Sequence, residues 1–319
     1  MPNTTAVRTA QVGAAPLFAG KNIIINGGMD IWQRGTTFTA TANLTYLADR
    51  WYNSTGTTLN VTRDTDVPTS PYFQYSLKMV GTGDNSIAMR LESANTIPLA
   101  GQTITMSFYA KRTSGAGALD VRFYYPSATD NFTSVTQIGS TSVLSASPSS
   151  SWTRYQVSVA IGTNITTGLL VLINNTGAST TFITGAQLEL GSTATTFSRN
   201  ASTIQGELAA CQRYYYRNTA VTVYSQLLNY AFAYNSSLSA ANVQFVVPMR
   251  VTPTSIEFSN ITFERYDNTK YAVSGILAGN GTPTGIWVYG TASGLTPNDV
   301  GRWCANNSTS AYFAFNAEL

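Results

Sequence analysis

The acidic side chains are the groups with which this chain could perform acid–base chemistry, because its 319 residues contain no histidine. The absence of histidine removes the usual general base, a common metal ligand and every Ser-His-Asp triad. Two carboxylates that together cleave a glycosidic bond face each other across a cleft, about 5–9.5 Å apart. The acidic residues of this sequence are instead dispersed along the chain. Their spacing does not indicate a pair of carboxylates that could act together as acid and base.

Two acidic stretches come nearest to this requirement. Asp64 and Asp66 could share one face of a strand, but Arg63 and the following VPTSP segment favour a solvated turn. Glu189 alternates with two leucines, which predicts a side chain that points outward, away from the core. We therefore predict no catalytic residues and interpret the protein as a non-enzyme.

Aromatic side chains are the second source of chemistry, because their faces can stack on the apolar face of a sugar ring while polar neighbours bind its hydroxyls. Tyr109 and Tyr124 are candidate contacts of this kind in the first two thirds of the chain. Tyr266, beside an Asp-Asn turn, is a candidate for an exposed contact. Trp287 and Tyr289 share one face of a strand and belong to such a site, to the core or to a subunit interface. The other aromatic residues considered in the first two thirds are Trp51, Tyr52, Tyr125 and Trp152, of which the two tryptophans are interpreted as buried ends of a sandwich.

Nucleic-acid binding is not expected from the distribution of charge. The formal net charge of +3 comes from scattered residues, and the densest basic pair is Lys111-Arg112. Binding to phosphates requires a stripe of such residues. The run Tyr214-Tyr215-Tyr216 could stack on bases, but we interpret it as structural, with Tyr215 in the apolar stripe of a helix and its neighbours packed against the adjoining domains.

Cys211 and Cys304 are the two cysteines of the chain. One disulfide between them is possible, but two buried thiols are favoured, and a scaffold built on disulfides is excluded. No cofactor is predicted.

The composition places the chain among folded proteins with a neutral, hydroxyl-rich surface. Charged residues make up 10% of it, against about 25% in ordinary domains, while 43% is hydrophobic. Its length favours two domains. No segment approaches the roughly 20 apolar residues of a membrane span, and residues 1–20 lack the pattern of a signal peptide. We therefore expect that the protein does not insert into a membrane. We also expect that it is synthesised in a cytoplasm and is not exported.

Short segments rich in Val, Ile, Thr, Tyr and Phe, separated by Gly, Pro, Ser and Asn clusters, fill residues 21–200 and predict an all-β sandwich. In the first clear example, Ile104, Met106 and Phe108 share one face. The stretch INGGMDIWQRG, residues 25–35, is interpreted as a first strand broken by a bulge. The clearest strands are expected over residues 103–112, 119–125, 154–161 and 169–175.

A helix is expected over residues 202–217, because apolar residues fall there at helical spacing and Ser202 with Gln205 forms a capping-box pair. Beyond it the chain returns to strands, with a hairpin turn at residues 266–270. The predicted fold is therefore all-β: a jelly-roll sandwich (21–200), a linking helix (201–217) and a small antiparallel β-sandwich (218–319). Strands of this last part are expected over residues 243–249, 255–266, 270–277, 285–290 and 311–319.

Several stretches of the first domain resemble jelly-roll carbohydrate-binding modules. They are NIIINGGMDIW (22–32), ADRW (48–51), SFYAKR (107–112), SWTRYQVSV (151–159) and AQLELGSTATTF (186–197). Many such modules hold a structural calcium ion between a carboxylate after the first strand and an aspartate of the last strand. Asp30 matches the first position, but the last strand reads Ile183-Thr184-Gly185-Ala186 without an acid. Because the second acidic ligand is missing, the resemblance does not imply a metal site in this chain.

The closing part of the chain resembles tail-fibre and related virion proteins of bacteriophages, through ELAACQRYYYR (207–217), VPMR (247–250) and AYFAFNAEL (311–319). That family joins a jelly roll by a short helix to a C-terminal β domain, often in trimeric appendages. The resemblance implies a virion location, with residues 1–20 docked on other virion proteins. It also implies a homotrimeric tip that attaches to a host glycan or protein receptor. A capsid decoration or head fibre, and a secreted carbohydrate-binding module, are the alternatives.

Overall fold

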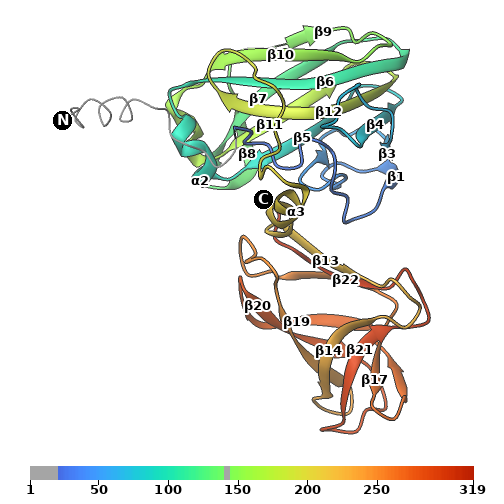
Figure 1. The fold of residues 1–319 in the computed structure, drawn as a ribbon. Helices are drawn as coiled ribbons and strands as arrows, with labels where there is room; N and C mark the ends of the chain where they lie inside the picture. Colours follow the sequence, from blue (N-terminus) through green and yellow to red (C-terminus); the bar gives the residue numbers. More distant parts are fainter. Residues whose placement is uncertain (1–20, 140–143) are drawn as a thin grey trace, which may run out of the picture. The chain divides into compact units, whose positions relative to one another are not determined.

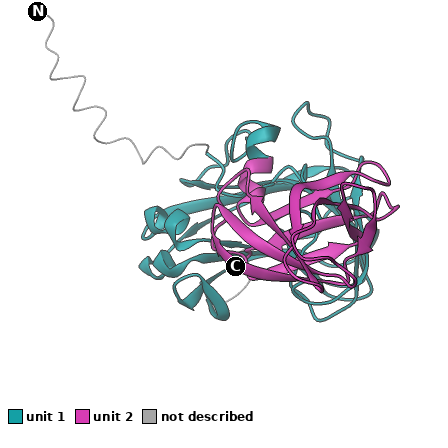
Figure 2. Cartoon of the chain, turned by 90° about the horizontal axis from the view of Figure 1, so that it is seen from below, with its two compact units in different colours: residues 1–207, 319 teal, residues 208–318 magenta. Residues whose placement is uncertain are grey.

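Antiparallel strands make up nearly all of the regular structure, which confirms the predicted all-β fold class. The structure is a computed structural model, and it describes residues 21–139 and 144–319. The proposed docking segment, residues 1–20, lies outside the described residues. The chain divides into two compact units, residues 1–207 with Leu319 and residues 208–318 (Figure 2). No helix in the described ranges is long and apolar enough to span a membrane.

The first unit is a sandwich of two antiparallel sheets (Figure 1). Strands distant in sequence are neighbours in both sheets, as in a jelly roll. In hydrogen-bonding order the first sheet contains β1 (Thr37–Thr41), β3 (Leu59–Asp64), β4 (Ser76–Gly81), β12 (Ser179–Leu190), β6 (Thr103–Gly115) and β10 (Thr153–Ala160). The second contains β2 (Tyr52–Asn53), β5 (Asn85–Leu91), β11 (Leu169–Asn175), β7 (Leu119–Ala128) and β8 (Asn131–Gln137), with β9 (Leu144–Ala146) paired to β7. Short helices α2 (Ser93–Thr96), η1 (Ile97–Leu99) and η2 (Thr163–Thr167) lie in the connections.

The interior of this sandwich confirms the predicted alternation in β6, because Ile104, Met106 and Phe108 are fully buried in one hydrophobic cluster. The opposite face of the strand is covered as well. Thr105 donates from its hydroxyl to the carbonyl of Gly191 at 2.6 Å. The segment that follows β12 therefore folds back over the outer face of the first sheet.

This covering segment changes the environment predicted for Glu189. Its side chain lies on the outer face of β12, opposite the leucines, but only 3% of the residue is exposed. The carboxylate accepts hydrogen bonds from the Thr195 N–H at 2.8 Å, the Thr195 hydroxyl at 2.7 Å and the Gln187 amide at 2.7 Å. The side chain therefore points outward as predicted, but the loop that returns over the strand buries it, which alternation along a strand does not reveal.

The stretch 25–35 forms turns rather than the predicted bulged strand. The side chain of Asn26 accounts for the difference, since its carbonyl accepts the N–H groups of Asp30 and Ile31, both at 2.9 Å. Its amide donates to the carbonyls of Ile31 at 2.8 Å and Asp49 at 3.0 Å. Asn26 itself has a φ of 57°. A side chain that bonds the local backbone in this way replaces the strand ladder.

The two glycines of this stretch now have a structural reason. A Cβ at Gly27 would overlap the carbonyl oxygen of Ala186 in β12. The backbone of Gly27 instead accepts the Ala186 N–H at 2.9 Å. Gly28 accepts a hydrogen bond from the Thr184 hydroxyl at 3.2 Å. The glycines therefore let the turn lie directly against the last strand of the sandwich.

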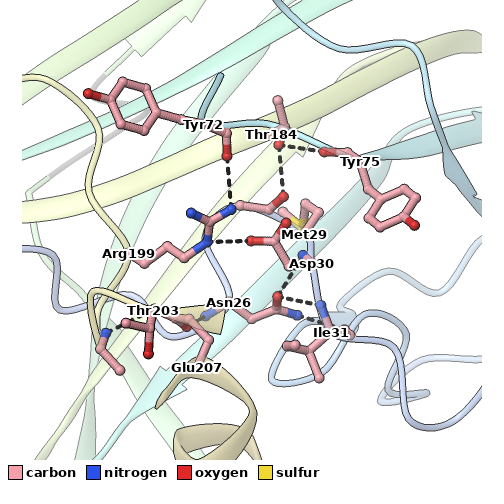
Figure 3. A network of polar contacts seen from close by, with 12 residues as sticks. Asn26, Met29, Asp30, Ile31, Tyr72, Tyr75, Thr184, Arg199, Thr203 and Glu207 are labelled. Atoms are coloured by element: carbon pink, nitrogen blue, oxygen red, sulfur yellow. Dashed lines mark hydrogen bonds and ion pairs between the residues drawn. The ribbon is translucent and has the colours of Figure 1, made fainter. Parts of the chain in front are cut away.

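An ion pair beside these glycines joins the start of the unit to its end (Figure 3). Asp30 accepts Nε of Arg199 at 2.8 Å, and Nη2 of Arg199 donates to the Tyr72 carbonyl at 3.0 Å. The Asp30 side chain is only 3% exposed and that of Arg199 15%. The acid that resembles a calcium ligand is thus neutralised by a guanidinium. Among the described residues, no group of three or more acidic or cysteine side chains could hold a metal ion.

Glu207 sits in the same network, in the first turn of helix α3 (Ile204–Gln212). Its carboxylate accepts the N–H groups of Asn26 at 2.7 Å and Ala201 at 3.0 Å. Burial raises the pKa of Glu207 and the charge of Asp30 adds to this rise, against the lowering effect of the backbone donors. The carboxylate therefore provides hydrogen-bond acceptors for two backbone N–H groups, but it loses contact with water.

The helix is shorter than the predicted span of 202–217. Thr203, not Ser202, caps it, since its hydroxyl accepts the Gly206 N–H at 3.1 Å. Ser202 has a φ of 63°. The helix ends at Gln212, and Tyr215 begins strand β13 (Tyr215–Thr219), so its predicted place in a helical stripe was wrong. Three consecutive aromatic residues favour a strand once a partner strand is present.

The second unit contains two further antiparallel sheets (Figure 1). All pairings in both sheets are antiparallel. The three-stranded sheet has the order β13, β22 (Tyr312–Asn316) and β16 (Ser255–Ser259). The seven-stranded sheet has the order β18 (Lys270–Ala272), β17 (Ile261–Arg265), β21 (Val300–Ala305), β14 (Gln226–Ala233), β15 (Leu238–Gln244), β20 (Gly285–Thr291) and β19 (Gly275–Thr282).

Several strand boundaries of this unit differ from the predicted ones. The strand expected over 243–249 is the end of β15, which stops at Gln244. The strand expected over 255–266 is divided into β16 and β17 by Asn260, whose φ is 49°. The segment 270–277 is likewise divided between β18 and β19. Strands β13, β14 and β21 were not predicted. The hairpin turn at 266–270 is confirmed, with Asn268 at a φ of 68°.

The tyrosine run and the cysteines have structural roles in the second unit. Tyr215 is buried and donates from its hydroxyl to Glu257 at 2.9 Å. Tyr216 packs edge-on against Phe245, with ring centroids 5.8 Å apart. Cys211 and Cys304 are both buried and form no disulfide, which confirms the favoured interpretation.

The ion pair predicts a large effect of a single substitution. Arg199→Ala leaves the buried Asp30 carboxylate without its cation, and breaking a buried pair in this way costs about 3–5 kcal/mol. We expect this loss in the unfolding free energy of the first unit, measured in urea. Arg63→Ala, which removes an exposed arginine, is the matched control and should cost less than about 1 kcal/mol. Equal losses in the two variants would contradict the assignment.

The raised pKa of Glu207 predicts a pH dependence of known sign. The folded state holds this proton more tightly than the unfolded state, whose carboxyl has its ordinary pKa of 4.5. Its contribution to stability is therefore complete below pH 4.5 and is lost as the pH rises through the folded pKa. Relative to Glu207→Gln, the unfolding free energy of the wild type should fall between pH 4 and pH 7. A constant difference over this range would exclude a raised pKa.

Candidate functional site

The outer face of the seven-stranded sheet carries a row of apolar side chains across five adjacent strands. The two ends of the row are well exposed, with Leu277 58% and Val300 51% accessible. Side chains opposite one another on antiparallel strands have Cβ atoms about 4.5–5.5 Å apart, so the row is continuous. In strand order from β21 to β19, the register places Val300, Phe232, Ala240, Tyr289 and Leu277 opposite one another.

Aromatic rings cluster around this row. Phe232 meets Trp287 edge to face, with centroids 6.3 Å apart and an interplanar angle of 82°. Tyr234 meets Tyr289 at 5.6 Å and 70°. The Phe232 and Tyr234 rings lie 6.4 Å apart. Edge-to-face contacts of this kind hold the rings in place, so the surface is ordered although it is open to solvent.

A groove of about 640 Å³ lies over these strands. This volume is in the range of ordinary ligand sites, and the lining combines aromatic rings with amide side chains. The groove is lined by Asn229, Tyr230, Ala231, Phe232, Ala240, Asn242, Gln244, Trp287 and Val300.

Two amides next to the indole form the polar part of the groove. Asn242 lies opposite Trp287 in the register of β15 and β20. Gln244 follows on the same face of β15, and its Nε2 donates to Oδ1 of Asn242 at 2.6 Å. Both amide side chains are exposed. The contact between them fixes the orientation of each amide relative to the ring.

A glycine on the neighbouring strand allows the rings to pack closely. A Cβ at Gly279 of β19 would lie 2.6 Å from Cε2 of Tyr289 and 3.0 Å from the carbonyl oxygen of Trp287. Any larger residue at this position would displace the Tyr289 ring or the β20 backbone. Glycine at position 279 is therefore required for the observed positions of Tyr289 and the β20 backbone beside the groove.

The far end of the same sheet carries the charged residues. Glu264 of β17 pairs with Arg302 of β21 at 2.8 Å and with Lys270 of β18 at 3.7 Å. Burial opposes ionisation of Glu264, but the hydrogen bonds from Arg302 and Cys304 and the nearby positive charges lower its pKa. Burial and this carboxylate raise the pKa of the Cys304 thiol to about 11. Lys270 and Arg302 are both paired with Glu264, and none of the three lines the groove.

The candidate residues of the second unit fall in three different environments. Trp287 lines the groove and is 39% exposed. Tyr289 stands beside the groove in the aromatic cluster. Tyr266 is 61% exposed on the β17–β18 turn, away from the groove lining. The structure brings Trp287 and Tyr289 together and leaves Tyr266 apart.

The candidates of the first unit are occupied by packing. Tyr109 meets Phe73 edge to face at 5.3 Å, and the Arg154 guanidinium lies 5.8 Å from its ring centroid. Tyr124 of β7 is partly buried against a hydrophobic cluster that includes Tyr52 and Leu170. The remaining aromatic residues considered there behave similarly: Trp51 is fully buried, Tyr125 packs against the main core, and Trp152 meets Phe182 edge to face at 6.4 Å.

Of the nine lining residues the sequence predicted only Trp287; those it missed include the residues that supply the other rings and the amides, Tyr230, Phe232, Asn242 and Gln244. A signal was present in β14, because Tyr230, Phe232 and Tyr234 alternate in NYAFAY and so lie on one face of a strand. The amides gave no signal, since a composition rich in Asn and Thr makes a single amide uninformative. Only the pairing of β15 with β20 places Asn242 beside an indole.

A second hollow, of about 550 Å³, lies in the first unit. Its lining includes Phe132 as the one aromatic residue, together with the charged Arg90 and Asp130. The Arg90 guanidinium already lies over the Tyr52 ring at 4.8 Å and near Phe132 at 5.5 Å. The groove of the second unit offers three aromatic rings and no charge, and is the better candidate.

The carboxylates are engaged in structural contacts. Asp66 pairs with Lys111 and accepts Nε1 of Trp152 at 3.0 Å, so it is not simply solvated as predicted. Partial burial acts in the opposite direction, but these hydrogen bonds lower the pKa of Asp66. Further ion pairs are Asp64 with Lys78, Asp120 with Arg122, and both Asp267 and Asp299 with Arg265.

No family model matches the chain, and no curated protein matches its sequence. Three solved structures illustrate its structural similarities. The CBM22-1 xylan-binding domain of Paenibacillus barcinonensis Xyn10C is 12% identical, covers 50% of this chain and 98% of its own, and has a TM-score of 0.34. The CBM22-1–CBM22-2 tandem domain of the same protein is 9% identical, covers 89% and 98%, and scores 0.35. The enzymatically active domain of bacteriophage CBA120 tailspike protein 4 is 14% identical, covers 54% and 22%, and scores 0.36.

At these identities and scores, the similarities carry no argument about what this chain binds or does. The geometry of the groove must support a function by itself.

The exposure of Trp287 predicts that it contributes little to folding. Trp287→Ala should lower the unfolding free energy of the second unit clearly less than a core substitution does, because the 39% exposed indole loses one edge-to-face contact and only part of the apolar burial of a core ring. Trp303 is 1% exposed and donates to Ser239 at 3.1 Å, so Trp303→Ala should cost about 3–5 kcal/mol. Urea denaturation of the two variants measures both values. A similar loss in both would place Trp287 in the core rather than at a site.

Proposed function

We propose that this protein is a non-catalytic glycan-binding protein and that the groove over β14, β15 and β20 is its binding site. One observation carries the proposal: Trp287, Phe232 and Tyr230 line an open groove together with the hydrogen-bonded amides of Asn242 and Gln244. This combination of aromatic faces and neutral hydrogen-bonding groups matches the two kinds of surface of a sugar ring.

Binding would follow from stacking and hydrogen bonding without proton transfer. The apolar face of a pyranose lies on the exposed indole of Trp287 and removes apolar surface from water. The amides then replace water molecules at the sugar hydroxyls. Each contact is individually weak because the groove is open, so a single site binds with modest affinity and several copies are needed for firm attachment.

The absence of catalysis is part of the proposal. Glycoside cleavage needs two carboxylates that are free to exchange protons. The carboxylates of the charged end of this sheet are held by Arg302, Lys270 and Arg265. The groove lining contains no acidic residue. The site can hold a glycan but supplies no acid and no base.

The finer proposal is a structural protein of a bacteriophage virion, a short tail fibre that attaches to the host surface. The sequence resemblance of residues 207–319 supports it, as does a neutral, aromatic surface suited to glycans. Residues 1–20 would dock on other virion proteins, and three copies of the chain would present three grooves. A capsid decoration or head fibre is the alternative location. A secreted carbohydrate-binding module would use the same groove outside a virion.

The groove predicts which aromatic residue binding depends on. The full-length protein should bind immobilised polysaccharide from a host cell surface, and Trp287→Ala should weaken this binding at least about tenfold, a loss of about 1.4 kcal/mol. Tyr266→Ala, which removes an exposed ring outside the groove, is the matched control and should bind like the wild type. Affinity is measured by biolayer interferometry.

Two companion measurements keep the proposal testable. Release of reducing sugar from the polysaccharide would contradict a non-catalytic role. Sedimentation of the wild type should give a trimer, and Trp287→Ala should leave the mass unchanged. A variant that lost its oligomeric mass instead of its glycan binding would identify the aromatic face as a subunit interface and overturn the assignment.

A further inference from the structure

We infer that the groove selects uncharged sugars and reads a pair of neighbouring hydroxyl groups through Asn242 and Gln244. This inference rests on the proposed function and specifies its ligand class. Three observations carry it: the sequence of the strands under the groove, the direction of the amide–amide hydrogen bond, and the register that places this pair beside Trp287.

Three of the four strands that contribute lining residues, β14, β15 and β20, contain no acidic or basic residue, and neither does the edge strand β19; the fourth strand, β21, contributes Val300. β14 reads QLLNYAFA, β15 LSAANVQ, β19 GILAGNGT and β20 GIWVYGT. On the next strand, Arg302 is paired with Glu264 at 2.8 Å. Asp299 is paired with Arg265 at 2.9 Å. A ligand in the groove therefore meets no unpaired charge on these strands.

This neutrality has a consequence for charged sugars. A carboxylate that leaves water without a cation beside it loses solvation that the amide donors of the groove restore only in part. The side-chain oxygen of Gln244 would also repel it. Uronic and sialic acids are therefore disfavoured, whereas neutral hydroxyls lose little on entering the groove.

The hydrogen bond between the amides gives the pair a polarity. Nε2 of Gln244 donates to Oδ1 of Asn242 at 2.6 Å. This contact uses one lone pair of Asn242 Oδ1 and one N–H of Gln244 Nε2, and Nδ2 of Asn242 takes no part in it and stays available as a donor to a ligand. The contact equally leaves Oε1 of Gln244 as the acceptor available to a ligand. The pair thus offers the unengaged donor group of Asn242 beside the unengaged acceptor of Gln244, on the same face of β15.

Two adjacent hydroxyls of a pyranose complement this pair. One hydroxyl accepts a hydrogen bond from Asn242 Nδ2, and its neighbour donates to Gln244 Oε1, since each hydroxyl can do both. Because Asn242 is the register partner of Trp287, the same sugar ring can stack on the indole while its hydroxyls reach the amides. The ligand class is a neutral pyranose with free adjacent hydroxyls.

The inference is tested with neutral hexasaccharides of glucose, mannose and galactose, each compared with its own C6-oxidised uronic acid form. Binding to the full-length protein is measured by titration calorimetry at low salt. We expect at least one neutral oligosaccharide to bind, and its oxidised form to bind at least tenfold more weakly. Gln244→Lys should strengthen binding of the oxidised form several-fold, and added salt should remove this gain.

Gln226→Lys is the matched control, because it adds the same charge on β14 outside the groove lining. It should leave the preference for the neutral form unchanged. Equal binding of the neutral and oxidised forms, both abolished by Trp287→Ala, would overturn the inference while leaving the glycan site intact. Preferred binding of the oxidised form would also overturn it. Binding of none of the sugars by the wild type or by Gln244→Lys would overturn the proposed function itself.

Discussion

The register between β15 and β20 is the constraint on which the proposed site depends. Pairing of Asn242 with Trp287 places an amide beside an indole, and a slip of one residue would turn every outer side chain of the strand inward. The inner face prevents such a slip, since Val243, Ile286 and Val288 are buried in the core of the second unit. The same packing that stabilises the sheet therefore sets the geometry of the groove.

Charge is scarce in this protein, and the structure concentrates it in places where it stabilises the fold. The Asp30–Arg199 pair joins the first turn of the sandwich to the segment after its last strand. Glu264 holds three outer strands of the second unit through Lys270 and Arg302. A buried or partly buried carboxylate in such a contact is poorly suited to proton transfer. The rest of the sheet is uncharged and can make stacking contacts and neutral hydrogen bonds, which are the contacts that suit neutral sugars.

The sequence and the structure disagree most where a hydrogen-bonding partner competes with a local pattern. The residues around Asn26 alternate as a strand would, yet the asparagine amide bonds four local and distant backbone groups and forms a turn. The helix expected through residue 217 stops at Gln212, because the tyrosines after it find a partner in β22. In both cases the local residue pattern favours one secondary structure, but a hydrogen-bonding partner elsewhere in the fold stabilises another. The spacing of residues does not reveal that partner.

The sequence alone determined the fold class, because period-two alternation and turn residues are local properties of a strand and its ends. It also indicated the hairpin at 266–270 and the burial of both cysteines. The groove was decided only by the tertiary structure. Its residues come from β14, β15, β20 and β21, which span positions 226–305 and become neighbours through the order of strands in one sheet. Strand order follows from the packing of the whole sheet, so no single segment carries the information that Trp287 faces Asn242 and Phe232.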